Sequence, residues 1–271
     1  MNTHVVNITP QIADMYLKNN IGTNRRISMN HVKKLALMME RGEWQQNGQT
    51  IVFLNDGTLI DGQHRLHAII MAQVPVKMLV VYGADKNSFV TIDSGKTRTT
   101  GDVFSTKNIP YANNTAAGII KVLEYRKAMK TNDGKGGRYK EQSQFSKTEC
   151  LNEYNLNPKI YDSASKIGFS TKSIVAPSFA TAITAIAMID NGHDKDKIKT
   201  FWNSVTTGEM LSHGHPALTL RNKLIQLKTC KMKMSKQEYL YTCTKAWNCA
   251  VENKRLKVIK LSDKQKTLLV L

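Results

Sequence analysis

The run Asp61-Gly62-Gln63-His64-Arg65-Leu66, here called the box, combines an acid, a glycine, an imidazole and a guanidinium group. It follows strand-like stretches at residues 50–54 and 58–60 and precedes an apolar stretch with helical spacing at residues 66–72. A junction between a strand and a helix exposes unpaired backbone N–H groups at the positive end of the helix dipole, which favours an anion such as phosphate. Because Gly62 has no side chain, a ligand can approach its backbone closely. The sequence therefore predicts a phosphate site at the box.

The side chains of the box support two interpretations. In the functional one, His64 and Arg65 donate to phosphate oxygens, Arg65 as a bidentate fork, and Asp61 holds a metal ion or a ribose hydroxyl. In the structural one, Asp61 caps the following helix, Arg65 pairs with a surface acid and His64 lies on a polar face. The grouping of polar side chains around one glycine favours binding, but the residues leave both interpretations open.

A second loop with basic residues extends from Asp93 to Arg98 and precedes a predicted helix. Its Lys96 and Arg98, placed among small residues, are typical of an anion cradle. The end of this loop is similar to that of a Walker A motif, but the position that requires a leading glycine holds Val90, which excludes a P-loop. The alternative is a solvated turn.

The net charge of +18 is concentrated in the later part of the chain. Residues 1–110 hold 12 Lys and Arg against 8 Asp and Glu, a net charge of +4, and the remainder holds 27 against 13, a net charge of +14. A basic region attached to a near-neutral one predicts a polyanionic partner, with nucleic acid as the first candidate. The alternative is a lysine-rich composition with a solvated basic face. The candidate nucleic-acid contacts are Lys135 and Arg138, in a loop rich in glycine and lysine, and Arg221 and Lys223, in a predicted helix.

Strand and helix patterns alternate up to about residue 108. From there to residue 252 the patterns are helical, and a strand is predicted only at residues 254–260. This order predicts an α/β (α+β) fold class with a small mixed domain at residues 1–108 and an all-helical basic domain at residues 109–271. A continuous apolar run at residues 76–82 indicates a buried strand. Alternating basic and apolar residues at 254–260 predict an edge strand or, alternatively, a basic ribbon for DNA. The predicted helices cover residues 10–18, 28–41, 99–104, 111–129, 146–155, 158–167, 177–190, 194–206, 215–228 and 235–252.

The cysteines and the apolar runs bear on the cellular compartment. The four cysteines show no CxxC pair and no metal-ligand spacing with histidine, which indicates buried thiols in a reducing environment. Residues 1–8 show no basic-then-apolar signal pattern, and no apolar run approaches the length of a membrane span. We therefore expect a cytoplasmic protein with no membrane partner.

Several segments together resemble the ParB/sulfiredoxin-like superfamily, in particular its phage-type proteins with a DGQHR box. These segments are Asn24-Arg25-Arg26-Ile27-Ser28, Gly42-Glu43-Trp44, Gln49-Thr50-Ile51 and the box, and the resemblance covers roughly residues 8–105. It implies a domain that binds a nucleoside triphosphate, ATP or CTP, in the cytoplasm of the host cell if the protein is phage-encoded. Phage-type relatives often show Asp-x-Gly-x-x-Arg where this chain has residues 93–98. The implied phosphate contacts are Gly62, Gln63, His64, Arg65, Lys96 and Arg98.

The resemblance leaves two classes of function open. One is an enzyme, such as a nucleotide-dependent NTPase, kinase or nuclease, with Glu43, Asp61 and His64 as catalytic candidates and a divalent metal such as Mg²⁺ as cofactor. Glu43 is a candidate general base because it follows a predicted helix and precedes the strand that leads to the box; its alternative is a solvated acid at a helix end. The other class is a non-enzymatic DNA-binding regulator or an inhibitor of a host protein. Sulfiredoxin has a cysteine in its box where this chain has Gln63, so sulfinic-acid repair is not implied.

Overall fold

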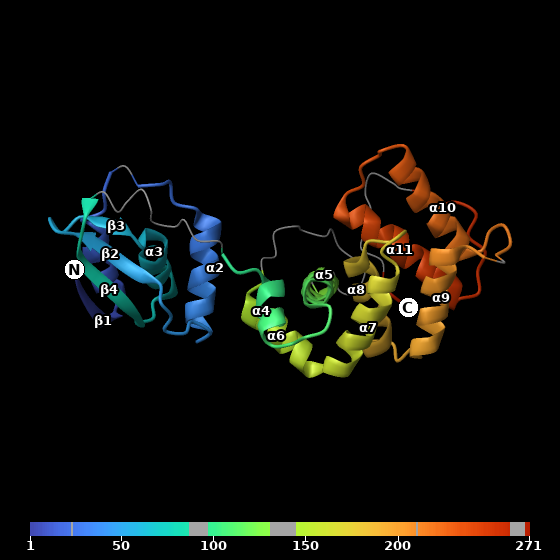
Figure 1. Cartoon of the computed structure of the whole chain (residues 1–271), viewed down its shortest axis with the longest axis horizontal. Helices are drawn as coiled ribbons and strands as arrows, with labels where there is room; N and C mark the ends of the chain where they lie inside the picture. Colours follow the sequence, from blue (N-terminus) through green and yellow to red (C-terminus); the bar gives the residue numbers. More distant parts are fainter. Residues whose placement is uncertain (23, 87–96, 131–144, 210, 261–268) are drawn as a thin grey trace. The chain divides into compact units, whose positions relative to one another are not determined.

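The computed structural model describes residues 1–22, 24–86, 97–130, 145–209, 211–260 and 269–271, and it divides the chain into two compact units. The first unit is Met1–Thr97 and the second is Arg98–Leu271 (Figure 1). This boundary precedes the predicted one at residue 108. The reason is that Phe104 is fully buried in the hydrophobic core of the second unit, so the short helix that carries it belongs there.

The first unit contains a four-stranded mixed sheet in the order β1-β4-β2-β3. β1 is antiparallel to β4, β4 is parallel to β2, and β2 is antiparallel to β3. Helices α1 and α2 both pack against α3, and the core lies between these helices and the sheet. The elements are β1 (Asn2–Ile8), α1 (Pro10–Leu17), α2 (Met29–Glu40), β2 (Thr50–Leu54), β3 (Leu59–Asp61), α3 (Gln63–Ala72) and β4 (Val76–Ala84).

Local signals place most of these elements where the sequence predicts them. The Thr9 side chain accepts a hydrogen bond from the Ile12 N–H group at 3.3 Å and caps α1, which begins at Pro10. The turn between β2 and β3 is closed by a hydrogen bond from Leu54 N to the Thr58 carbonyl oxygen at 2.9 Å. The strand β1 was not predicted.

All regular elements in the described residues of the second unit are helices, and the chain as a whole is an α+β protein, as the sequence predicts. Capping boxes begin α4, α6 and α11, and prolines occupy the first turn of α7, α8 and α10, which explains why the helix starts follow from sequence. The helices are α4 (Thr100–Thr106), α5 (Ala112–Lys130), α6 (Lys147–Leu156), α7 (Pro158–Ser170), α8 (Pro177–Ile189), α9 (Lys195–Thr207), α10 (Pro216–Thr229) and α11 (Lys236–Val251).

Helix α8 forms the centre of this unit, because every residue from Phe179 to Ala187 is buried. Helices α5 and α7 pack closely on α8 through two glycines. A Cβ atom at Gly118 would lie 2.5 Å from Thr181 Cγ2, and one at Gly168 would lie 2.1 Å from Thr181 Oγ1. The absence of side chains at these two positions therefore sets the distance between the helices.

The edge strand predicted at residues 254–260 is wrong. The segment is irregular, and its backbone bonds to loops and helices instead of a strand: Leu256 N donates to the Gly214 carbonyl oxygen at 2.8 Å, and Thr219 Oγ1 donates to the Leu256 carbonyl oxygen. Leu256 and Ile259 are buried while Val258 is exposed, so the burial does not alternate as a strand requires.

None of the helices in the described ranges combines the length and the apolar character needed to cross a membrane.

Candidate functional site

Gly62 determines the path of the chain from β3 into α3. Its φ angle is +106°, in a region of backbone conformation that residues other than glycine rarely adopt. A Cβ atom at this position would lie 2.4 Å from Ile51 Cδ1 and 3.3 Å from Ile51 Cα. Glycine is therefore required twice, for the backbone conformation and for the close approach to β2.

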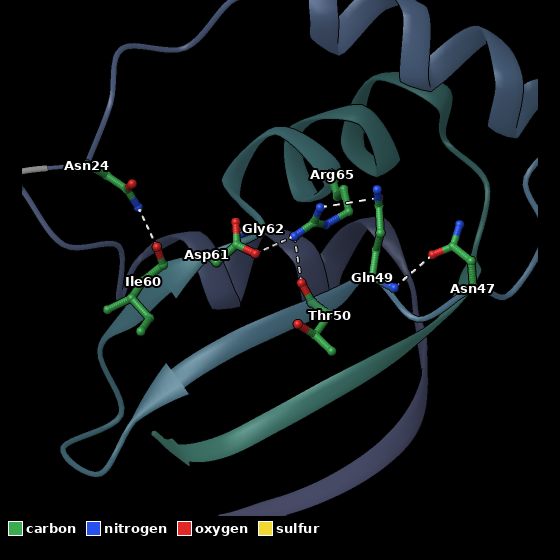
Figure 2. A network of polar contacts seen from close by, with 8 residues as sticks. All are labelled: Asn24, Asn47, Gln49, Thr50, Ile60, Asp61, Gly62 and Arg65. Atoms are coloured by element: carbon green, nitrogen blue, oxygen red, sulfur yellow. Dashed lines mark hydrogen bonds and ion pairs between the residues drawn. The ribbon is translucent and has the colours of Figure 1, made fainter. Parts of the chain in front are cut away.

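Asp61, at the end of β3, and Arg65 of α3 form an ion pair, and Arg65 also bonds to β2 (Figure 2). Arg65 Nη2 donates to Asp61 Oδ2 at 2.8 Å and to the Thr50 carbonyl oxygen at 2.6 Å, and Asp61 Oδ1 accepts from the Gly62 N–H group at 2.7 Å. Arg65 Nη1 donates to Gln49 Oε1 at 3.4 Å. The acid that pairs with Arg65 is therefore the first residue of the box itself, and both side chains are mostly buried, with 15% and 17% of their surface exposed.

Gln63 and His64 are buried and hold the segment between α1 and α2. Gln63 Nε2 donates to the Arg25 carbonyl oxygen at 2.7 Å, and Gln63 Oε1 accepts from Asn20 Nδ2 at 3.2 Å. His64 Nε2 accepts from the Ser28 N–H group at 3.0 Å. This bond requires a lone pair on Nε2, so His64 is neutral in this arrangement and carries its proton on Nδ1.

The first turn of α3 has no side-chain cap. Backbone N–H groups at the start of a helix have no partner within the helix, and they face the same end as the positive pole of its dipole. The binding of an anion at the N-terminus of α3 stays a prediction.

Basic and imidazole groups gather near this end of α3. We call them the basic cluster: Arg25, His31, Lys34, His64, Arg65 and His67. The rings of His31 and His64 meet edge to face, with centroids 5.4 Å apart. Burial lowers the pKa of His31, and the charges of Lys34, Arg25 and Arg65 lower it further. Burial likewise lowers the pKa of His64, followed by the charges of His31, Arg25, His67 and Arg65. The cluster therefore has an excess of positive charge.

Four members of this cluster, Arg25, His31, Lys34 and His67, were not among the site residues predicted from the sequence. The pair on α2 shows why. His31 and Lys34 are three residues apart on α2, a spacing that places both on one face of a helix. That spacing was a usable signal, but only the packing of α2 against α3 connects it to the box.

Glu43 lies just beyond α2 and is half-buried. The ion pair described for it joins Glu43 Oε1 to Arg41 Nη1 at 3.9 Å. Its role as a general base stays a prediction. In the described ranges, no group of three or more His, Cys, Asp or Glu side chains could hold a metal ion.

The other predicted site residues are distributed over the second unit or fall outside the described residues. Lys96, Lys135 and Arg138 lie outside the described residues, and Arg98 belongs to the second unit. Arg221 Nη1 donates to the Val205 carbonyl oxygen at 3.1 Å and to the Thr206 carbonyl oxygen, so it closes the C-terminus of α9. Lys223 is half-buried on α10.

The fold and the site thus define an α+β protein with a strand–glycine–helix junction beside a basic cluster. Comparison of the chain with protein-family models, with curated proteins and with solved structures finds no match.

The neutral state of His64 predicts a pH-dependent stability for the first unit. The pKa of His64 is lowered from the ordinary value of 6.5, so the unfolded chain binds the proton more readily than the folded one. We expect the stability to be complete above pH 6.5 and to be lost progressively as the pH falls through the lowered pKa. Hydrogen exchange across residues 50–84, measured from pH 7.5 to 5.0, reports this loss.

The substitution His64→Gln places an amide oxygen where Nε2 accepts the Ser28 N–H group but cannot titrate. It should flatten the pH dependence, with the remaining slope due to His31. His4→Gln, which removes an exposed imidazole from β1, is the matched control and should keep a steeper pH dependence than His64→Gln. Equal slopes for the His64→Gln variant and the unmodified protein would contradict the assignment.

Proposed function

We propose that the first unit binds the phosphate groups of a nucleotide at the N-terminus of α3. The observation that carries the proposal is the position of the basic cluster beside a helix start that has no side-chain cap. Backbone N–H groups and the helix dipole favour an anion there, and the cluster supplies the surrounding positive charge.

The electrostatics of the cluster support an anionic ligand. Asp61 already pairs with Arg65, while the pKa values of His31 and His64 are lowered first by burial and then by the charges of their basic neighbours. A phosphate group carries up to two negative charges and three acceptor oxygens, so it would relieve this repulsion. The resemblance to the ParB/sulfiredoxin-like superfamily supports a nucleotide, ATP or CTP, over a simple phosphate, with Mg²⁺ entering together with the nucleotide.

Neutralising Lys34 tests the proposed phosphate site directly. The charge of this lysine lowers the pKa of His31, and the lysine makes none of the hydrogen bonds described above for the box. We expect Lys34→Gln to weaken ATP or CTP binding roughly 2- to 10-fold, the effect of losing about 0.5–1.4 kcal/mol of Coulomb attraction in a partly hydrated site. Isothermal titration calorimetry with ATP, CTP and inorganic phosphate measures the affinity and distinguishes a nucleotide from phosphate alone.

The matched control is Lys33→Gln, which removes the same charge from the neighbouring, exposed position of α2. It should leave the affinity nearly unchanged. If both variants lose affinity equally, binding depends only on overall charge, and the proposed site is wrong.

We further propose that the second unit contacts nucleic acid. Residues 98–271 hold 29 Lys and Arg against 14 Asp and Glu, a net charge of +15, whereas residues 1–97 hold 10 against 7, a net charge of +3. Contacts to the phosphate backbone release counterions, so the logarithm of the affinity should fall linearly with the logarithm of the salt concentration. Fluorescence anisotropy with labelled duplex and single-stranded DNA between about 50 and 300 mM salt measures this slope.

The substitutions Lys135→Gln and Arg138→Gln test the predicted loop contacts, and each should reduce the magnitude of the slope by about 1 if the side chain binds a phosphate. Arg221 is unsuitable for this test because it closes α9. An affinity that does not change with salt would contradict a contact with the DNA backbone.

Turnover distinguishes the enzyme from the non-enzymatic alternatives, a DNA-binding regulator or an inhibitor of a host protein. Hydrolysis, phosphoryl transfer and strand cleavage can be assayed with the full chain, nucleotide, DNA and Mg²⁺. Activity that Glu43→Gln abolishes without weakening nucleotide binding supports the enzyme, because that change removes only the carboxylate charge. Nucleotide binding without any turnover supports the regulator.

A cytoplasmic location is part of the proposal, since all four cysteines are free thiols.

A further inference from the structure

Two aromatic rings lie exposed and in contact with each other on the second unit. Tyr111 directly precedes α5 and Phe169 lies in the last turn of α7, and each residue is 40% exposed. The ring centroids are 5.0 Å apart, and the ring planes are tilted by 38°. Every other Phe, Tyr and Trp residue within the described ranges is buried or half-buried. The exposed aromatic surface of the described residues is therefore gathered in one place, which we call the aromatic pair.

Folding gives little reason for a large ring at position 111. The φ angle of Tyr111 is +50°, in the left-handed region that residues other than glycine and asparagine seldom adopt. Burial of the ring offsets this cost only in part, because much of the residue faces solvent. Side chains held in sparsely populated backbone conformations cluster at binding sites, so the conformation of Tyr111 favours a role in recognition.

The aromatic pair has cations beside it. Lys172 Nζ lies 4.8 Å from the centroid of the Phe169 ring, within the range of a cation–π contact. Lys166 is exposed and precedes Phe169 by three residues, a spacing that places both on one face of α7. The stretches that carry the two rings, residues 103–123 and 163–189, contain four lysines and no Asp or Glu. The aromatic pair is thus complementary to a ligand that combines a flat apolar face with negative charge.

We propose that the aromatic pair binds an unpaired base of single-stranded nucleic acid by stacking on Tyr111, and that Lys172 binds an adjacent phosphate. A single strand offers both groups, whereas the bases of a duplex are already stacked on one another. Every base has a flat face, so binding of this kind tolerates many sequences. The inference rests on the nucleic-acid contact proposed above for the second unit, and it specifies the ligand as a single strand of DNA or RNA.

Four labelled probes, each about 12 nucleotides long, separate base stacking from phosphate binding in fluorescence anisotropy with the full chain. They are oligo-dT, oligo-rU, a duplex, and an abasic oligonucleotide that carries the same phosphates without bases. We expect oligo-dT or oligo-rU to bind at least about 5-fold more tightly than the abasic probe, and their ratio distinguishes DNA from RNA.

The probes also distinguish the two ways in which the inference can fail. Equal affinities for the abasic probe and both oligonucleotides with bases would overturn base stacking and leave the nucleic-acid contact of the second unit standing. A chain that binds none of the four probes would overturn both proposals. These comparisons use the unmodified protein, so they do not depend on the folding of any variant.

Two substitutions with opposite effects locate the binding. Tyr111→Leu keeps an apolar side chain but removes the ring, so it should weaken oligo-dT binding at least about 5-fold and leave the abasic probe unaffected. Lys172→Gln should weaken both probes alike and reduce the magnitude of the salt slope by about 1. A Tyr111→Leu chain that binds oligo-dT as tightly as the unmodified protein, or that loses both probes equally, would overturn the inference.

Two controls accompany these variants, and circular dichroism checks that each one folds. Tyr111→Phe keeps the stacking face and should bind oligo-dT within about 2-fold of the unmodified protein. Leu156→Ala removes an exposed apolar side chain from the end of α6 and should leave the affinity unchanged. If Leu156→Ala weakens oligo-dT binding as much as Tyr111→Leu does, the loss is not specific to the aromatic pair, and the inference is wrong.

Discussion

Gly168→Ala is expected to destabilise the second unit by about 3 kcal/mol, the upper range for overpacking a well-packed core. A Cβ atom at Gly168 would lie 2.1 Å from Thr181 Oγ1, 2.7 Å from the Pro177 carbonyl oxygen and 2.8 Å from Thr181 N. The Pro177 oxygen and the Thr181 nitrogen are backbone atoms of α8, so no rotation of a side chain removes the clash. Alanine normally favours a helix by up to about 1 kcal/mol over glycine, and the expected change has the opposite sign.

Urea unfolding followed by circular dichroism measures the effect, and Gly118→Ala provides the comparison. Its Cβ atom would meet Thr181 Cγ2 at 2.5 Å and Thr181 Cβ at 3.0 Å, which are side-chain atoms. Thr181→Ser removes Cγ2 and keeps the hydroxyl that accepts from Asn114 Nδ2. It should therefore partly rescue Gly118→Ala but not Gly168→Ala. A Gly168→Ala protein as stable as the unmodified one would contradict the packing of α7 on α8.

Arg126→Met should destabilise the same unit by about 3 kcal/mol, because it leaves the buried Glu153 carboxylate without its cation. Arg126 Nη1 donates to Glu153 Oε1 at 2.7 Å, and Arg126 Nη2 donates to Asp190 Oδ1 at 2.8 Å. Only 8% of the Glu153 side chain is exposed, and Tyr161 Oη donates to the same Oε1 atom at 2.5 Å. The value is at the low end for a buried pair because 27% of the Arg126 side chain reaches solvent.

The control for this ion pair is Glu252→Gln, which breaks an exposed pair with Lys254 and should change the stability by less than about 0.5 kcal/mol. Adding Glu153→Gln to Arg126→Met removes the uncompensated charge and should recover part of the loss. Thermal unfolding of the single and double variants gives the comparison. A double variant less stable than Arg126→Met alone would show that the charge of Glu153 is not the cause.

The fold of the second unit follows from the sequence because its helices are marked by residues that act locally. Pairs such as Ser146 with Glu149 and Ser235 with Glu238 form capping boxes that any reader of the sequence can find. β1 was not predicted because it lacks such local signals. Most of its residues are exposed on both faces, so hydrophobicity does not alternate, and its conformation depends on pairing with β4, far along the chain.

The strand–helix junction was predictable in position, but the contacts of its side chains were not. The strand–glycine–helix junction at Gly62 follows from local patterns, and it is confirmed. Which way Gln63 and His64 point depends on the segment that crosses them, and their bonds to the Arg25 carbonyl and the Ser28 N–H group have no sequence signature. Arg65 is similar, since its partners Thr50 and Asp61 come together only when β2 and β3 pair.

The pairing of β1 with β4 also determines when the first unit can form during synthesis. β1 leaves the ribosome before its partner β4, which begins only at Val76. At about 5–20 residues per second, β1 waits roughly 4–14 s for its partner. Throughout that interval an uncharged segment rich in β-forming residues, Asn2–Ile8, lies unprotected. A nascent chain stalled near residue 60 should therefore be more prone to bind chaperones or to aggregate than one stalled beyond residue 84.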